Sequence, residues 1–210
     1  MIRVVLVDDH ALTRRGVRDT LSEHADIRVV GEAGNYAELR ELLRRTECDV
    51  LLLDINLPGR NGIEVLQQLR DEQSPIKVLV LSMYPEDQYA IRALKVGAAG
   101  YLNKASDPSM LPDAVRHVFS GRKYITPDIA LALVDNLTAP DDALPHQRLS
   151  DRELQTLLHI ASGRRLSDIA EALAISPKTV SVYRARVLEK LGLSNNAELT
   201  HYALKHKLVE

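Results

Sequence analysis

The stretch "LLLDINLPGRNG", residues 51–62, places the carboxylate of Asp54 directly after three leucines. A buried parallel strand reads as a short, continuous apolar run, so we expect such a strand to end at this point. In parallel α/β sheets, ligands bind at the carboxyl ends of the strands. Asp54 is therefore a candidate for a functional side chain.

Similar apolar runs recur along the first part of the chain and alternate with amphipathic stretches. The expected strands are Ile2–Val7, Ile27–Val30, Val50–Leu53, Ile76–Leu81 and Gly100–Leu102. The expected helices are Ala11–Ser22, Tyr36–Arg45, Gly62–Arg70, Asp87–Val96 and Met110–Phe119. This alternation predicts an α/β fold with a five-stranded, doubly wound parallel sheet and right-handed crossovers.

The composition is that of a globular chain without export signals. Its 210 residues are 45% hydrophobic, enough to fill the cores of one or two domains. No apolar run approaches the roughly 18 residues of a membrane helix, and the N-terminal residues do not resemble a signal peptide. Cys48 is the single cysteine, so an internal disulfide is excluded and a reducing, cytoplasmic compartment is expected, with no membrane partner.

The distribution of charge and a segment rich in proline and aspartate divide the chain into two parts. Residues 1–147 carry 17 basic and 22 acidic side chains, whereas residues 148–210 carry 10 basic and 7 acidic ones. The segment "NLTAPDDALPHQRLS", residues 136–150, interrupts the apolar periodicity with two prolines and two aspartates. We expect domains at 1–122 and 148–210, joined by a linker at 123–147 with a helix near 127–135.

Polar side chains follow four of the five expected strands. Asp8 and Asp9 follow the first strand, Asp54 the third, Ser82 the fourth and Lys104 the fifth. Three carboxylates in one crevice repel each other unless a cation offsets them, and Mg²⁺ prefers oxygen ligands while leaving positions for a phosphoryl group. The pattern predicts that Asp54 is a nucleophile that takes a phosphoryl group beside Mg²⁺ and Lys104.

The motifs "VDDH", "LLLDINLPGRNG", "VLSMY" and "GYLNK" resemble the receiver domain of two-component response regulators over roughly the first 120 residues. The resemblance implies a flavodoxin-like sheet in the order 2-1-3-4-5. It also implies that Asp9 binds Mg²⁺ directly, that Asp8 acts largely through water and that the backbone carbonyl of Asn56 completes the site. Ser82 and Tyr101 would form the switch pair. Ala105 follows the lysine, where relatives commonly have proline or aspartate.

Two enzyme classes are alternatives to this interpretation, and the sequence lacks a feature that each requires. Phosphatases of the haloacid dehalogenase type carry an acid/base aspartate two residues after the nucleophile, where this chain has Asn56. A dinucleotide-binding fold requires a G-x-G-x-x-G turn after the first strand, where this chain has "DDHALTRRG". We therefore expect no enzyme beyond self-phosphorylation and self-dephosphorylation.

The second part of the chain has the signals of a small all-α domain. Ser150 and Glu153 form a capping box for a first helix, Ser167 is a candidate cap for a second, and Ser176 with Pro177 begins a third at Pro177–Leu191. Asn195 caps a fourth helix. Two helices joined by a short turn, the second of them basic, indicate a helix-turn-helix.

One face of Pro177–Leu191 is apolar and the other is available to DNA. Val180, Tyr183, Val187 and Leu191 recur at helical spacing and are expected to face the core. The remaining side chains suit phosphates and base edges of a major groove. The candidate DNA-binding residues are Lys178, Thr179, Ser181, Val182, Arg184, Ala185, Arg186 and Lys190.

Residues 149–193 resemble the LuxR-type DNA-binding domain, so the whole chain resembles a NarL/FixJ-family response regulator. "SPKTVSVYRARVLEKL" and "GRKYITPDIA" are similar to the GacA/UvrY subgroup, which implies a hybrid sensor kinase as partner. Ser181 and Tyr183 stand where many relatives have lysine and histidine, so individual base contacts are not transferred.

The resemblance implies a transcription factor that a sensor histidine kinase phosphorylates at Asp54 and that binds promoter DNA, as a homodimer when phosphorylated. The alternative is a phosphorylation-independent DNA-binding regulator with a vestigial receiver. The presence of Asp8, Asp9, Asp54 and Lys104 argues against that alternative.

Overall fold

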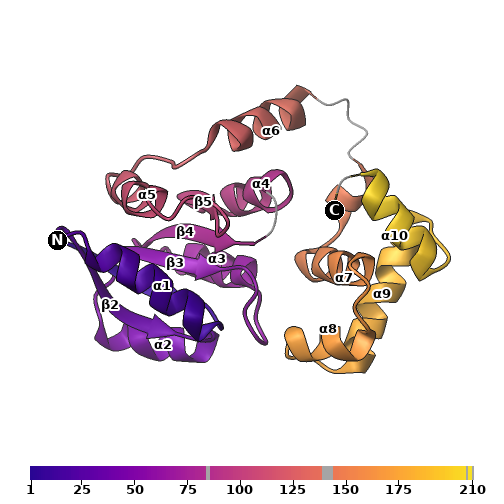
Figure 1. Cartoon of the computed structure of the whole chain (residues 1–210). Coiled ribbons are helices and arrows are strands. Elements are labelled where there is room, and N and C mark those ends of the chain that lie inside the picture. The colour runs from indigo at the N-terminus through magenta and orange to yellow at the C-terminus, as the bar shows by residue number, and fades with distance from the viewer. Residues whose placement is uncertain (84–85, 139–143, 207, 210) are drawn as a thin grey trace. The chain divides into compact units, whose positions relative to one another are not determined.

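The protein is described by a computed structural model that covers residues 1–83, 86–138, 144–206 and 208–209. The chain divides into two compact units, Met1–Leu137 and Thr138–Glu210, which are described separately below (Figure 1). Among the described helices, none combines the length and the apolar character needed to cross a bilayer.

The first unit is built on a parallel sheet. Its strands are β1 (Ile2–Val7), β2 (Ile27–Ala33), β3 (Val50–Asp54), β4 (Lys77–Ser82) and β5 (Gly100–Asn103). They lie in the order β2-β1-β3-β4-β5, and every neighbouring pair is parallel. The predicted α/β fold, strand order and orientation are confirmed.

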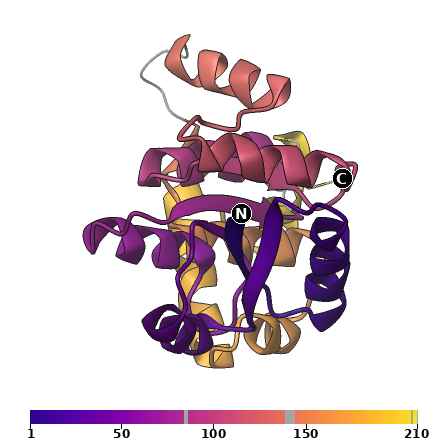
Figure 2. The same ribbon diagram turned by 90° about the vertical axis from the view of Figure 1, so that its left-hand side faces the viewer.

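Helices cover both faces of this sheet (Figure 2). They are α1 (Ala11–Ser22), α2 (Tyr36–Arg45), α3 (Gly62–Asp71), α4 (Glu86–Val96) and α5 (Met110–Phe119). Helix α1 contacts α5, and α3 contacts α4. Because α1 to α4 each connect two parallel strands, the carboxyl ends of all five strands meet at one edge of the sheet.

The strand boundaries differ from the sequence expectation where pairing extends a strand beyond its apolar run. Strand β2 continues to Ala33 because it pairs with β1 as far as Val7. Asp54 is the last residue of β3, in register with Leu81, and Ser82 is the last residue of β4, in register with Asn103. The two polar side chains therefore belong to the strands and are fixed by the sheet.

The turn after β3 is held tightly against the sheet. The backbone nitrogen of Gly62 donates to the carbonyl oxygen of Ile55 at 2.9 Å. A Cβ atom at Gly62 would overlap the carbonyl oxygen of Asp54 and lie 2.8 Å from the Cα of Ile55. Asn61 caps α3 through the nitrogen of Ile63. The "NG" at the end of the quoted stretch thus lets the turn close behind Asp54.

Helix α6 (Pro127–Thr138) follows the sheet and falls largely in the first unit. The predicted helix near 127–135 is therefore present. In the second unit, the 3₁₀ turn η1 (Pro145–Arg148) precedes α7 (Asp151–Ala161), α8 (Leu166–Ala172), α9 (Pro177–Leu191) and α10 (Asn196–Lys205).

The second unit is held by contacts of α7 with α9 and α10, and of α8 with α9. The capping box of α7 is present, and the side chains of Ser176 and Asn195 cap α9 and α10 as predicted. The prediction for Ser167 is wrong. Helix α8 begins at Leu166 with Arg165 at the N-cap position, and the Ser167 hydroxyl donates to the side chain of Asp168 instead.

Candidate phosphoacceptor site and DNA-binding helix

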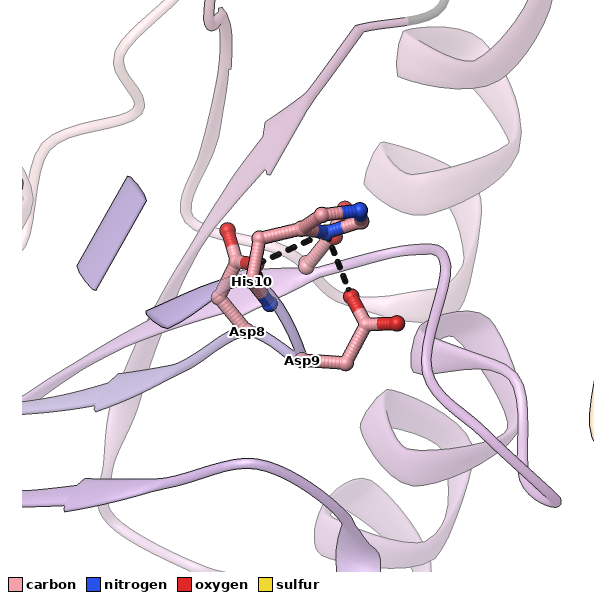
Figure 3. A group of neighbouring side chains, drawn as sticks. Asp8, Asp9 and His10 are labelled. Carbon is pink, nitrogen blue, oxygen red and sulfur yellow. Dashed lines mark hydrogen bonds and ion pairs between the residues drawn. The ribbon is translucent and has the colours of Figure 1, made fainter. Parts of the chain in front are cut away.

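The end of β1 and the start of α1 bring two carboxylates and an imidazole together (Figure 3). The backbone nitrogen of His10 donates to Oδ1 of Asp8 at 2.8 Å, which fixes the buried carboxylate. Nδ1 of His10 lies 2.7 Å from Oδ1 of Asp9 and 3.4 Å from Oδ1 of Asp8. The three consecutive residues therefore form one side of a polar crevice.

Asp54 and Lys104 form the other side. Nζ of Lys104 lies 2.8 Å from Oδ2 of Asp54 and 2.6 Å from Oδ2 of Asp8, so one ammonium group bridges two carboxylates. The backbone nitrogen of Asn56 donates to Oδ1 of Asp54 at 3.2 Å. Asp54 is 3% exposed, and its environment is set by these groups more than by bulk water.

Burial raises the pKa of Asp54 to about 6, although the charge of Lys104 and its hydrogen bond act in the opposite direction. The neighbouring Asp8 carboxylate adds to the increase. Burial lowers the pKa of Lys104, but its contacts with Asp54 and Asp8 outweigh this effect, so the net shift is upward. The lysine is therefore a permanent cation beside the candidate nucleophile.

The arrangement fits a divalent cation with oxygen ligands. One ligand atom from each of Asp8, Asp9, His10 and Asp54 lies within 4.8 Å of all the others. Three of the four are carboxylates, which suit Mg²⁺, and several carboxylates around a single ammonium leave negative charge that a cation would offset. The predicted ligands Asp8, Asp9 and Asp54 are thus brought together, and Asn56 lies two residues beyond Asp54.

The predicted switch residues are both buried in the first unit. Ser82 ends β4, and its carbonyl oxygen accepts a hydrogen bond of 2.8 Å from the backbone nitrogen of Lys104. Tyr101 lies in β5, in register with Val80, and its side chain is fully buried. Ser82 is thus joined to the lysine of the crevice through the backbone, and Tyr101 lies in β5, three residues before that lysine, which directly follows the strand.

In the second unit, α9 has the two faces that the sequence predicts. Val180 and Val187 are buried, whereas Tyr183 and Leu191 are half-buried at the margins of the contact. Six of the predicted DNA-binding residues are exposed, and all but Lys190 lie on the face opposite Val180 and Val187. They are Lys178, Ser181, Val182, Ala185, Arg186 and Lys190.

Four of the predicted DNA-binding residues have hydrogen-bond or ion-pair partners within the domain. Nζ of Lys190 lies 2.7 Å from Oε2 of Glu153, a buried carboxylate of α7. Nε of Arg184 donates to Oδ1 of Asn196 at the start of α10, at 2.5 Å. The backbone nitrogen of Thr179 donates to the Ser176 hydroxyl as part of the helix cap. The Ser181 hydroxyl donates to the carbonyl oxygen of Pro177 within α9. The side chains of Lys190 and Arg184 therefore join α9 to α7 and α10.

Sequence reasoning missed two contacts of the site. It did not predict that the ring of His10 would contact Asp9. It also assigned Lys190 to DNA without its partner Glu153. The capping box at Ser150 was a usable signal, because it places Glu153 at the start of α7, but the distance to α9 depends on tertiary packing.

Comparison with known proteins covers both units. Residues 4–116 match the family described as "Response regulator receiver domain", and residues 147–203 match "Bacterial regulatory proteins, luxR family". The chain therefore belongs to the response regulators that join a receiver to a LuxR-type DNA-binding domain, the NarL/FixJ family. It is a phosphorylation-activated transcription factor of this family.

Within the family, the chain falls in the GacA/UvrY subgroup. It is 38% identical to response regulator UvrY of Escherichia coli K12 over 209 residues, which cover 99% of this chain and 96% of UvrY. It is 38% identical to response regulator GacA of Pseudomonas aeruginosa PAO1 over 212 residues, which cover 100% and 99%.

Solved structures of response regulators share the fold. RcsB of Salmonella enterica serovar Typhimurium, bound to the promoter rprA in the presence of the phosphomimetic BeF₃⁻, aligns with a TM-score of 0.67 and 25% identity. The alignment covers 96% of this chain and 97% of that one.

Proposed function

We propose that Asp54 is the phosphoacceptor of this transcription factor and that its modification controls binding of α9 to promoter DNA. The observation that carries the proposal is the pairing of a buried Asp54 carboxylate with Lys104 at the carboxyl edge of the sheet, next to Asp8 and Asp9. No other described group of His, Cys, Asp and Glu residues has this convergence.

The acidic residues of the crevice would hold Mg²⁺. Asp8, Asp9 and Asp54 would supply carboxylate oxygens, and Asn56 would supply its backbone carbonyl. When bound, the ion offsets the negative charge of the phosphoryl oxygens. The Nδ1 contact of His10 holds the Asp9 carboxylate at the mouth of the crevice.

The chemistry of the chain itself is a phosphoryl transfer. An ionised Asp54 oxygen forms a bond to phosphorus while the bond from phosphorus to the histidine nitrogen of a sensor kinase breaks, which gives an acyl phosphate. Lys104 is placed to neutralise charge on the new phosphoryl group. Asn56 has no carboxylate to act as a general acid or base, so turnover would be limited to slow self-dephosphorylation.

Ser82 and Tyr101 would transmit the modification. A phosphoryl group on Asp54 offers new acceptors to Lys104 and to the Ser82 hydroxyl at the end of the adjacent strand. A shift of Lys104 and Ser82 would alter the backbone at the end of β5, three residues after the buried Tyr101. The phosphorylated receiver would then pair with a second copy.

In the second unit, Lys178, Ser181, Val182, Ala185 and Arg186 would enter the major groove. Arg184, Lys190 and Thr179, which are partnered within the domain, would act at the margin of the interface. A homodimer would present two α9 helices to half-sites related by two-fold symmetry. A solved RcsB structure, at 26% identity, is described as two dimers bound to two parallel DNAs, which supports a dimer here.

The proposed partners are a sensor histidine kinase, of the hybrid type by analogy with the subgroup, and promoter DNA. Because that DNA is the target, the proposed compartment is the cytoplasm. We propose 1–122 as the functional receiver, 123–147 as the linker and 148–210 as the DNA-binding domain.

The test of the phosphoacceptor is intact-mass analysis after treatment with a small phosphodonor and Mg²⁺. The wild type should gain one phosphoryl group, and Asp54→Asn should gain none. Asp71→Asn, a carboxylate at the end of α3 outside the cluster, is the matched control and should be labelled like the wild type. Equal labelling of Asp54→Asn would contradict the assignment.

A further inference from the structure

A cavity lies at the end of the sheet opposite Asp54. It has a volume of about 350 Å³ and is lined by the end of α3, the start of β4, the turn before β5 and the segment after α5. Lys77 is paired in register with Val50, at the start of β3, whereas Asp54 ends that strand. Four residues of strand separate the two positions, or about 13 Å.

The rim of this cavity is strongly basic. Four cationic side chains line it: Arg70, Lys77, Arg122 and Lys123. In the part of the chain that the structure describes, Lys77, Arg122 and Lys123 form no ion pair with a carboxylate, and Arg70 lies 3.8 Å from the exposed Asp71. The positive charge at this edge is therefore largely uncompensated, although residues 1–147 are acidic as a whole.

Lys123 is fixed in position with hydrogen-bonding capacity to spare. Its Nζ donates to the carbonyl oxygen of Ala98 at 2.5 Å, and an ammonium group has three donors. Burial and, to a lesser extent, the charge of Lys77 lower the pKa of Lys123. An anion between the two lysines would relieve their repulsion and accept the remaining donors.

The inner wall of the cavity is apolar. Leu69, Ile76 and Val118 line it behind the cations. Gly97 leaves the wall without a side chain at a point where an added Cβ would lie 3.5 Å from Cδ of Arg70. The volume is at the lower end of the range for small-molecule sites, about 300 to 1,000 Å³. The cavity therefore combines space for a compact apolar group with a cationic rim.

We propose that this cavity is a binding site for a small organic phosphate, whose phosphate lies between Lys77 and Lys123 and whose apolar body contacts Leu69, Ile76 and Val118. A dianionic phosphate suits four cations better than a carboxylate does, because arginine and lysine side chains can each donate to a separate oxygen. The site is distinct from the Asp54 crevice. Lys123 precedes α6 by four residues, so an occupied site would tether the edge of the sheet to the segment that leads to the second unit.

The experiment is calorimetric titration of the full-length protein with phenyl phosphate in EDTA, which keeps the Asp54 crevice free of metal. Phenyl phosphate should bind, benzoate should bind more weakly, and the neutral benzamide should not bind measurably. Lys77→Gln combined with Lys123→Gln should weaken phenyl phosphate binding by about tenfold or more, because charge-assisted hydrogen bonds are lost.

Three further variants guard against misfolding and against binding elsewhere. Arg122→Gln changes a cation hydrogen-bonded to the Ser120 hydroxyl at the surface, and it should also weaken binding. Arg15→Gln, an exposed arginine of α1, and Asp54→Asn should bind like the wild type. The proposal is overturned if phenyl phosphate does not bind, if benzamide binds equally well, if the lysine and Arg122 variants bind like the wild type, or if Asp54→Asn abolishes binding.

Discussion

The ammonium nitrogen of Lys104 lies 2.8 Å from Oδ2 of Asp54, which makes the lysine the counterion of the candidate phosphoacceptor. The same nitrogen also contacts Asp8 at 2.6 Å. Its removal would leave two buried carboxylates without their cation. The stability of the metal-free protein should therefore depend on this lysine.

Lys104→Met should lower the free energy of unfolding in EDTA by about 3 kcal/mol, the range for removing one partner of a buried pair. The measurement is urea denaturation at pH 7.5. In Asp54→Asn, the same lysine substitution should cost less, with a coupling on the order of 1 kcal/mol, since Asp8 remains. Lys178→Met, on the exposed face of α9, is the control and should change stability by less than about 0.5 kcal/mol. Strict additivity of the two substitutions would contradict the pairing.

The stability of the metal-free protein should also vary with pH through Asp54. Its pKa is raised from 3.8 to about 6 by burial, so the folded state favours the protonated form. The stabilisation of the folded state by the protonated Asp54 carboxyl is fully present below pH 3.8 and is lost as the pH rises through 6. Asp54→Asn lacks this pH-dependent contribution. The free energy of unfolding of the variant minus that of the wild type should therefore increase between pH 5 and pH 7, by on the order of 1 kcal/mol.

His159, in the second unit, also makes the stability depend on pH. The contribution of Asp54 is therefore read from the difference between the wild type and Asp54→Asn. Burial lowers the pKa of His159 from 6.5 to about 4, with the charge of Arg164 as a smaller cause. Its contribution to stability is present above pH 6.5 and is lost as the pH falls through 4, opposite in sign to that of Asp54. His159 is common to both proteins and cancels in the difference between their curves. A difference that is flat with pH would contradict the burial of Asp54.

Asp9 should control the binding of Mg²⁺ with little effect on the metal-free fold, because it is the exposed carboxylate of the cluster. Asp9→Asn retains an oxygen for the His10 ring but loses the charge. Its Mg²⁺ affinity should fall by more than about tenfold, which is typical of losing even a group that orients a ligand. Titration of the wild type and of Asp9→Asn with Mg²⁺ in the same buffer checks this. Wild-type affinity in Asp9→Asn would place the metal elsewhere.

The sequence predicted those features of the fold and the site that depend on residues close together in the chain, and it missed those that depend on strand pairing or packing. The run Leu51–Leu53 ends at Asp54, and a parallel sheet brings its strand ends together, so the convergence of Asp54, Asp8 and Lys104 was predictable. The extra residues at the end of β2 were not, because they are set by pairing with β1. The Ser167 cap failed for a similar reason: several start positions for α8 are locally acceptable, and packing selects among them.

The two lysines of α9 should have separable effects. Lys178 is exposed, so Lys178→Gln should reduce the salt slope of DNA binding by about one unit and leave stability unchanged. Lys190 is paired with the buried Glu153, so Lys190→Gln should lower stability and change the salt slope less. Binding to specific and random duplexes across salt, with thermal unfolding of the same variants, separates the two. A large loss of slope in Lys190→Gln without loss of stability would contradict the structural role.

Val182 provides a test of base reading by the same helix. It is exposed on α9 and uncharged, so Val182→Ala should leave the salt slope unchanged. Specific affinity should fall by at most about 1 to 3 kcal/mol, the range of a good base contact. Equal effects of Val182→Ala on specific and random duplexes would show that the residue does not read sequence.

Phosphorylation of Asp54 should control the binding of DNA by the second unit. The most direct test measures the affinity of the full-length protein for a specific duplex before and after treatment with a phosphodonor and Mg²⁺, with the labelled fraction read by intact mass. Labelled wild type should bind the duplex at least about tenfold more tightly, in line with common coupling energies, and Asp54→Asn should be neither labelled nor activated. Labelled wild type that binds no better than the unlabelled protein, or activation of Asp54→Asn, would contradict it.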